Sequence, residues 1–416
     1  MYGFEIYEEE FIKPLFMSLD ILKRSNVMFC GPEVSFTKKY WRFFYMVPLV
    51  VLHYISLSAY ILKLFTEGVD PFEKADMLPL WLATVEYWIN IVILMINQDK
   101  IRDLIVHMGS IWRITGLNEK QMKIKTGALK RLYYAGIAVN KVGLAMSWQY
   151  LLSPLCETVI RRLFLKQEAE LQLPFDCVYP FETKDWPIYL AVYAFQVYCI
   201  FHIIYVYQGV GWLLVVLTTH MHVQFLLLQE DLVQVKPEIK GRAIKTLSED
   251  ADEITQYVDG ADVRIDDFVR RHQDLISLAE KLDSSCNKFT FTIMLFATLV
   301  ICFFAVAAKA SKGAAYALNN YGVVVVKLMS MLIQCYCCQL LSSSSSGIAM
   351  AAAKNLWYKG DLRYQTNIRF IMMRSLKPCS LTLLGLTPID LGTFNKVLKT
   401  TWSYFSLASQ MYDARD

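Results

Sequence analysis

Two ionisable residues stand inside apolar segments of the sequence and are its first candidates for chemistry. Glu86 is the ninth residue of the segment 78–97, and Lys141 is the ninth residue of the segment 133–153. If these segments cross a bilayer, an isolated charge there costs at least about 2.5–3.5 kcal/mol, and such residues usually pair or serve a function. We therefore expect Glu86 and Lys141 to form an intramembrane ion pair, either structural or as the polar wall of a ligand pocket. Lys327, near the start of a further apolar segment, should instead extend to the membrane surface.

A second pattern with chemical meaning is a polar stripe along the last apolar segment, 394–412. Its polar residues recur in steps of three and four, at Lys396, Lys399, Ser403, Ser406, Gln410 and Asp413. This spacing places them on one face of a helix. Because a polar face is costly in lipid, the stripe must face protein or water. Several copies around an axis would line a channel with hydroxyl and amide groups, and the alternative is a helix that only packs between subunits.

Signatures of catalysis and of metal binding are missing from the sequence. It contains no Gly-x-Ser-x-Gly, P-loop or zinc-protease motif, and no paired carboxylates within the apolar segments. His220 and His222 are two residues apart, so on a helix they point to different faces. We therefore expect no enzyme, no metal and no cofactor. Cys156 and Cys177 share one connection and would form a disulfide if that connection were extracellular.

The composition is that of a protein that crosses a membrane several times. Of 416 residues, 55% are hydrophobic and 19% are charged. A spanning helix needs about 20 mostly apolar residues, and charged residues do not occur in 43–62, 186–229, 289–308 and 328–353. This pattern excludes a cytosolic enzyme, a disordered scaffold and a nucleic-acid-binding protein. We predict an all-α membrane protein with seven spans, at 44–64, 78–97, 133–153, 187–217, 289–308, 322–347 and 394–412.

The uncharged stretch 186–229 is longer than one span requires. As a single helix, its 44 residues would reach about 66 Å, twice the bilayer core. Two spans would place the basic cluster between Lys354 and Lys377 outside the cell, although Lys and Arg are normally in excess in cytoplasmic loops. We therefore predict one long helix that continues into the cytosol. With seven spans, the N-terminus is then cytosolic and the C-terminus extracellular.

The predicted organisation follows from these spans. It comprises a cytosolic N-terminal segment (1–43), helices one to four as a ligand-binding bundle (44–228), a cytosolic helical extension or anchor (229–288), helices five and six (289–347), a cytosolic half-helix with its linker (348–393), and a last helix with an extracellular tail (394–416). The extension carries apolar residues at helical spacing, which favours a packed helix over a linker.

The C-terminal third of the chain carries a set of short motifs in a fixed order. They are Trp357-Tyr358, Lys377-Pro378, Leu391, Thr393-Phe394, the run Val397-Leu398-Lys399-Thr400, and Ser403-Tyr404-Phe405. With these motifs, this part of the chain resembles the insect odorant receptor family. The segment FCGPEVSFTKKYWRFFYMVPL before the first span also looks like members of this family, including moth pheromone receptors. The rest of the chain matches the family in length, number of spans and direction.

This resemblance implies an odour-tuned subunit of a tetrameric, ligand-gated, non-selective cation channel. Such subunits assemble with a shared co-receptor subunit in the plasma membrane of olfactory sensory neurons. The polar stripe and this resemblance together place the pore at Lys399, Ser403, Ser406, Leu407, Gln410, Met411 and Asp413. Of these residues, the constriction would fall at Leu407, Gln410 and Met411, where apolar side chains can close a pore by dewetting.

The family also places a pocket for a small volatile apolar ligand among helices two to six. Suitable pockets are lined by aromatic and aliphatic side chains with one or two polar groups. Helical spacing selects the candidates Thr84, Tyr87, Trp88, Leu144, Trp148, Tyr198, His202, Tyr205, Phe303 and Met329. Each of them could equally be an ordinary helix-packing residue.

Two other functions fit seven spans. A metabotropic receptor acting through a G protein would have its N-terminus outside the cell, whereas the charge pattern here predicts the opposite. A secondary transporter would show repeated halves or helices broken at mid-membrane, and the sequence has no internal repeat. The odorant-gated channel therefore remains the first hypothesis and the metabotropic chemoreceptor the alternative.

Overall fold

The computed structural model describes residues 7–27, 36–67, 71–164, 171–183, 185–235, 265–310 and 314–413. Its helices are α1 (Glu9–Arg24), α2 (Phe36–Thr66), α3 (Pro71–Ser110), α4 (Glu119–Val159), α5 (Trp186–Gln234), α6 (Ile265–Ala310), α7 (Ala314–Lys354), α8 (Leu362–Ser375) and α9 (Leu391–Asp413). A π-helical turn, η1 (Ile160–Phe164), follows α4, and a 3-10 turn, η3 (Trp357–Lys359), precedes α8. Two short antiparallel strands, β1 (Thr382–Leu383) and β2 (Thr387–Pro388), join α8 to α9.

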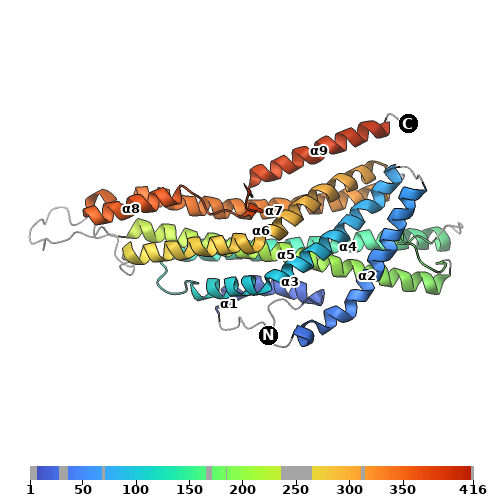
Figure 1. Cartoon of the computed structure of the whole chain (residues 1–416), viewed down its shortest axis with the longest axis horizontal. Helices are drawn as coiled ribbons and strands as arrows, with labels where there is room; N and C mark the ends of the chain where they lie inside the picture. Colours follow the sequence, from blue (N-terminus) through green and yellow to red (C-terminus); the bar gives the residue numbers. More distant parts are fainter. Residues whose placement is uncertain are drawn as a thin grey trace, which may run out of the picture.

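Each of the seven predicted spans lies within one helix: α2, α3, α4, α5, α6, α7 and α9. Five of them, namely α2, α3, α5, α6 and α7, are long and apolar enough to cross a membrane by composition alone. The more polar α4 and α9 complete the set, and both run alongside the others (Figure 1). The prediction of an all-α membrane protein with seven membrane helices is confirmed.

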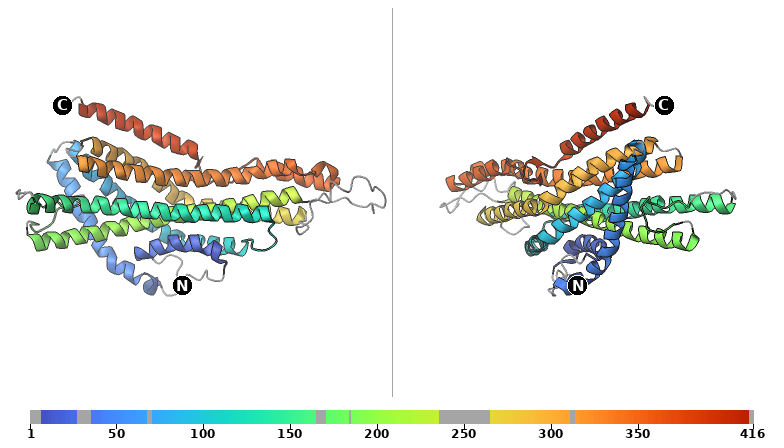
Figure 2. Two further views of the ribbon diagram at one scale, coloured as in Figure 1. Left: turned by 180° about the vertical axis from the view of Figure 1, so that it is seen from behind. Right: turned by 45° about the vertical axis from the view of Figure 1, so that its right-hand side comes forward.

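The helix α5 forms the centre of the bundle. It runs without interruption through 49 residues, a length of about 74 Å, and it packs against α1, α3, α4, α6 and α7. The prediction of one long helix in place of two spans is therefore confirmed. Asp185 precedes the helix and Pro187 occupies its first turn, where a proline is well tolerated because its missing N–H has no partner there. Figure 2 gives two further views of the bundle, in which the light green α5 runs along its length.

The segment after α7 folds back along the bundle. α8 packs against the C-terminal end of α7, and α9 runs back beside α6 and α7 (Figure 1). The hairpin between them is held to α6, because Thr382 donates from its backbone N–H and its hydroxyl to the Asp283 carboxylate, at 2.6 and 2.9 Å. Gly385 closes the hairpin turn with a φ of +77°, a conformation that suits glycine. The end of the bundle that carries α8 is called the α8 end below.

The domain boundaries drawn from the sequence do not coincide with breaks in the helices. α5 and α6 each pass through a predicted boundary, at 228 and 288, as continuous helices. Residues 236–264 of the predicted extension lie outside the described part of the chain. Of the residues in the extension, Phe268, Leu278 and Leu282 are fully buried in the main hydrophobic core, which is what their helical spacing predicts.

Candidate functional site

A cavity of about 430 Å³ lies among α3, α4, α5 and α7, with α6 closing one side. Two glycines in the cavity wall let long side chains of neighbouring helices approach closely. A Cβ added to Gly143 on α4 would meet the Gln208 side chain of α5, and one added to Gly211 on α5 would lie 2.8 Å from Nε2 of Gln334 on α7. Small residues at such positions allow large side chains from neighbouring membrane helices to reach inward.

Most of the cavity wall is apolar. Aliphatic side chains predominate, with Tyr150, Phe175 and Phe304 among the aromatic ones. Val142 on α4 and Val325 and Met329 on α7 line the cavity and are also more than half exposed on the outside of the chain, so the cavity opens between α4 and α7. A space of this size and lining is typical of a site for a small apolar molecule.

A buried ion pair forms part of the wall. Lys327 Nζ on α7 lies 3.6 Å from Glu86 Oε2 on α3, and the two side chains are 13% and 2% exposed. The same ammonium stands 3.4 Å from the centre of the Tyr207 ring on α5, a cation–π contact. Asn90, one turn further along α3, is within hydrogen-bonding reach of the Glu86 carboxylate. Three helices therefore share one charged cluster that faces the cavity.

This arrangement corrects two predictions. Glu86 pairs with Lys327 and not with Lys141, which is exposed on the surface of α4. Lys327 does not extend to the membrane surface. The uncharged run of sequence starts only at Leu328, but α7 begins at Ala314, so Lys327 is the fourteenth residue of the helix and lies well inside it. The need of Glu86 for a basic partner was predicted correctly, but the helix that supplies it was not.

The structure brings only part of the predicted ligand-binding set to the cavity. Thr84, Tyr87 and Met329 line it, whereas Trp88, Leu144, Trp148, Tyr198, His202, Tyr205 and Phe303 do not. On α5 the lining residues are the neighbours of the predicted ones, such as Ile203, Ile204 and Tyr207. Leu144 and Tyr205 pack instead around a small separate core that contains Phe175.

The lining residues that the sequence reading missed share a simple signal. On α4 and α5 several of them are glycines or polar residues, namely Asn140, Gly143, Ser147, Gln208 and Gly211. Aromatic residues are a weaker guide, because they occur on every face of these helices. A helix turns by about 100° per residue, so an error of one position moves a side chain to a different neighbour.

The polar stripe of α9 lies on the side of the helix that the rest of the chain does not cover. Lys396, Lys399, Ser403 and Gln410 are exposed, and Ser406 is half-buried. Leu407, beside the stripe, is also exposed. The side chains of Met411 and Asp413 lie outside the described part of the structure.

The opposite face of α9 packs against the bundle. Phe394 and Val397 contact the main core, and Thr401 is buried. Lys309, near the end of α6, donates a hydrogen bond to Ser409 of α9. The main contacts of α9 are therefore with α6 and α7, and its polar face is left exposed by the residues that the structure describes.

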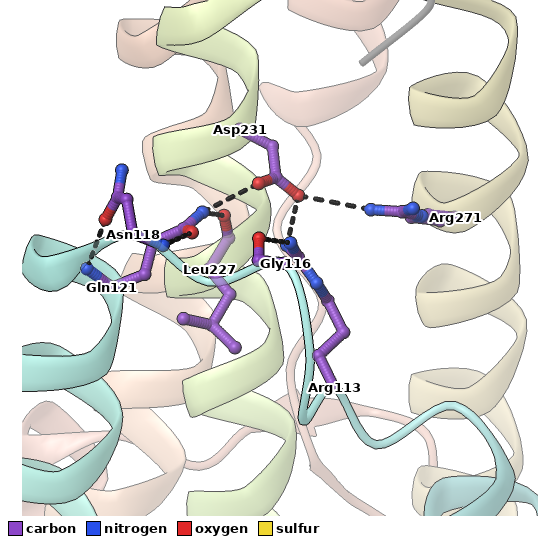
Figure 3. A network of polar contacts seen from close by, with 7 residues as sticks. All are labelled: Arg113, Gly116, Asn118, Gln121, Leu227, Asp231 and Arg271. Carbon is purple, nitrogen blue, oxygen red and sulfur yellow. Dashed lines mark hydrogen bonds and ion pairs between the residues drawn. The ribbon is translucent and has the colours of Figure 1, made fainter. Parts of the chain in front are cut away.

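A second polar cluster lies at the α8 end and involves no cavity. The Asp231 carboxylate on α5, 4% exposed, accepts hydrogen bonds from Arg113 and from Gln121, and its nearest oxygen lies 3.4 Å from Arg271 of α6. Figure 3 shows these side chains converging on the aspartate, with Asn118 and Gln121 capping the start of α4. One buried carboxylate thus ties α4, α5, α6 and the α3–α4 connection together.

Cysteine and histidine residues offer no further site within the described residues. Cys156 and Cys177 are both free thiols, so the disulfide considered above does not form in this structure. Burial raises the pKa of the Cys177 thiol to about 12. His220 packs against Phe11, and His222 bonds through Nδ1 to the Leu340 carbonyl at 3.0 Å. No group of three metal-ligating side chains occurs in the part of the chain that the structure describes.

These features define a class: an all-helical membrane protein that holds a largely apolar cavity within its helix bundle. The family model described as 7tm Odorant receptor matches residues 75–402. The chain belongs to this odorant receptor family, and the resemblance noted in its C-terminal third is confirmed.

Individual relatives agree with this assignment. Odorant receptor 49a of Drosophila melanogaster is 22% identical over 94% of this chain and 97% of its own length. Putative odorant receptor 92a of the same species is 25% identical, and that alignment spans 62% of this chain and 60% of the relative, less than two thirds of it. These relatives are receptors and not enzymes.

A solved structure shows the same fold. The insect olfactory receptor OR5 from Machilis hrabei, in complex with eugenol, matches 97% of this chain and 100% of its own, with a TM-score of 0.77. A second structure of the same receptor matches 95% of this chain and 97% of its own, with a TM-score of 0.74. Sequence identity is 14% in both cases, so the likeness concerns the arrangement of the helices.

Proposed function

We propose that this chain is an odour-tuned subunit of a ligand-gated, non-selective cation channel in the plasma membrane of olfactory sensory neurons. In this proposal, the N-terminus and the α8 end are cytosolic and the C-terminus is extracellular. The subunit assembles with a shared co-receptor subunit into a tetramer. The last helices of the four subunits surround the pore, and a volatile apolar molecule in the cavity opens it.

The observation that carries this proposal is the exposed polar face of α9. Lys399, Ser403 and Gln410 follow one another along a helix whose other face is packed on α6 and α7. An exposed polar stripe on a membrane helix is unfavourable in lipid, so it calls for water or a further protein surface. A ring of such helices meets both needs, because the stripe then lines an aqueous path while neighbouring copies cover its flanks.

The cavity supports the proposed ligand class. Its size and apolar lining suit a small organic molecule, and its opening between α4 and α7 gives such a molecule a route in. The relative OR5 from Machilis hrabei has been solved in complex with eugenol, a small volatile compound. We propose that this chain also binds a small volatile compound, which need not be eugenol.

A physical route from the cavity to the pore helix runs along α6. Val300 and Phe304 of α6 line the cavity, and Lys309, little more than one turn further on, contacts Ser409 of α9. A ligand that shifts this part of α6 therefore acts on α9 through direct packing. Such a ligand opens the channel only if it binds the open state more tightly than the closed state.

Whole-cell recording tests the proposal. Cells that express this chain with the co-receptor subunit should give odour-evoked inward cation currents, and cells with either chain alone serve as controls. A C-terminal epitope tag should be accessible on intact cells. If surface-expressed protein gives no current with any odorant, or if the tag is reached only after permeabilisation, the channel proposal fails and a metabotropic receptor becomes the better reading.

A charge placed on the stripe tests the pore separately. Gln410→Lys adds up to four positive charges along the ion path of the tetramer. Each added charge repels a cation that passes within a few ångströms by about 1 kcal/mol, even in water. We expect cation currents to fall severalfold. Tyr404→Lys is the matched control, because Tyr404 is also exposed on α9 but lies off the stripe. Equal effects of the two substitutions would remove α9 from the pore.

A further inference from the structure

Several of the polar groups that line the cavity are hydrogen-bond acceptors without partners. Five side-chain oxygens on cavity-lining residues are buried and accept no hydrogen bond from any described residue. They are Oε1 of Glu86, Oδ1 of Asn90 and of Asn140, and Oε1 of Gln208 and of Gln334. Buried oxygens of this kind are uncommon in native proteins and usually meet water or a ligand.

Two donors around the cavity are also buried without a described partner, namely the Tyr87 hydroxyl and Nε1 of Trp212. Lys327, which carries the positive charge of the site, is held between Glu86 and the Tyr207 ring. The Glu86 carboxylate can only accept hydrogen bonds while it is ionised. Five unpartnered oxygens therefore stand against two unpartnered donors, so most of the free hydrogen-bonding capacity of the wall is on the acceptor side.

The acceptors are distributed around the cavity and not confined to one helix. Glu86 and Asn90 come from α3, Asn140 from α4, Gln208 from α5 and Gln334 from α7. The remaining wall is aliphatic and aromatic. A ligand with one hydroxyl group and an apolar body can therefore satisfy an acceptor while its body contacts the apolar wall.

We infer that the cavity prefers odorants that carry a hydroxyl group over aldehydes, esters and hydrocarbons with the same carbon skeleton. A hydroxyl can donate to any one of the five buried oxygens and can also accept from Tyr87 or Trp212, whereas a carbonyl group can only accept and so leaves all five oxygens unpartnered. A site built to bond a polar group discriminates strongly against analogues that lack it. This inference rests on the proposed function, because it takes the cavity to be the odorant site.

A binding experiment tests the preference without relying on ion conduction. The chain and its co-receptor are purified together in nanodiscs, and the thermal stability of the complex is measured with octanol, octanal, octyl acetate and octane. The compounds are compared at equal concentration in the lipid phase, because they partition differently. The stabilisation by a ligand grows with the logarithm of the ratio of its concentration to its Kd. At equal concentration, the ligand that binds more tightly therefore gives the larger shift in melting temperature. We expect octanol to give the largest shift.

Three glutamines provide matched variants. Gln208→Met and Gln334→Met each remove one unpartnered acceptor from the cavity wall with little change in side-chain length. One hydrogen bond contributes a factor of about three to ten in affinity, so the variant that removes the acceptor used by the hydroxyl should reduce the preference for octanol over octyl acetate by about that factor. Gln224→Met is the control, since Gln224 is also buried on α5 but does not line the cavity.

The outcomes separate this inference from the channel proposal. Equal or greater stabilisation by octyl acetate or octane overturns the hydroxyl preference, and so does an unchanged preference in both Gln208→Met and Gln334→Met. A preference for octanol in the binding assay supports the inference even if no current is recorded, and in that case it is the channel proposal that fails.

Discussion

The Glu86–Lys327 pair makes the sharpest prediction for stability. Both side chains are nearly buried, and Lys327 stands 3.6 Å from Glu86 Oε2. Removing one partner of a buried pair leaves an uncompensated charge and typically costs about 3–5 kcal/mol. Lys327→Met should therefore destabilise the protein strongly, although a buried carboxyl can take up a proton and so recover part of this cost.

The double variant Glu86→Leu with Lys327→Met removes both charges together. Replacing a buried pair by apolar side chains of similar size is often neutral or stabilising. We therefore expect the double variant to regain most of the stability that each single variant loses, which is a strong positive coupling in a double-mutant cycle. Thermal loss of the monodisperse fraction in detergent, measured by fluorescence-detected chromatography, reports the four stabilities side by side.

Lys141→Met is the control for this experiment, because Lys141 occupies a similar predicted depth but is exposed on α4. Its stability should stay close to that of the unmodified chain. The reasoning is refuted if Lys327→Met is as stable as the unmodified chain, or if Lys141→Met shows the larger loss and couples to the change at Glu86.

Three further predictions concern packing and polar contacts elsewhere. Asp231→Ala should cost about 3–5 kcal/mol of stability in the same chromatographic assay, because it leaves Arg113 without its buried partner. The control Lys120→Ala removes an ion pair whose lysine is 69% exposed, and it should change stability by less than about 1 kcal/mol. Gly136→Ala should lower the yield of folded protein, because its Cβ would collide with side chains of α1 and α5, and Gly127→Ala, with open space around it, should not. Asn355→Ala should cost about 1–3 kcal/mol and speed hydrogen exchange at the end of α5, because the Asn355 amide donates to two backbone carbonyls there, at 2.7 and 2.8 Å.

The helices could be predicted from the sequence because their signals are summed over many residues. The stretch 186–229 had no charge over 44 residues, and the distribution of basic residues then decided between one helix and two. The same reasoning placed all seven membrane helices. It did not predict the position of Lys327 along α7, because the start of an uncharged run shows where the last charged residue lies and not where the helix begins.

The candidate site could be predicted only in part because it depends on the rotation of each helix. Thr84 and Tyr87 were found, but on α4 and α5 the chosen faces were off by about one residue. Hydrophobic periodicity could not correct this. A helix that is apolar on every side, as α5 is, gives no preferred face from sequence. The glycines at 143 and 211 were better markers, because they show where neighbouring side chains approach closely.

The contacts of α9 bear on how the proposed channel would open. Its first turn is fixed, since Thr393 donates from its backbone to the Asp390 carboxylate at 2.7 Å, and the hairpin before it is bonded to α6. Further along, the contact between Lys309 and Ser409 joins it to the part of α6 that reaches the cavity. A ligand-driven shift of α6 should therefore swing the far end of α9 about its fixed first turn. Distances between spin labels at Leu407 of neighbouring subunits should then change more on ligand binding than those at Lys396, and an equal change at both positions would contradict this pivot.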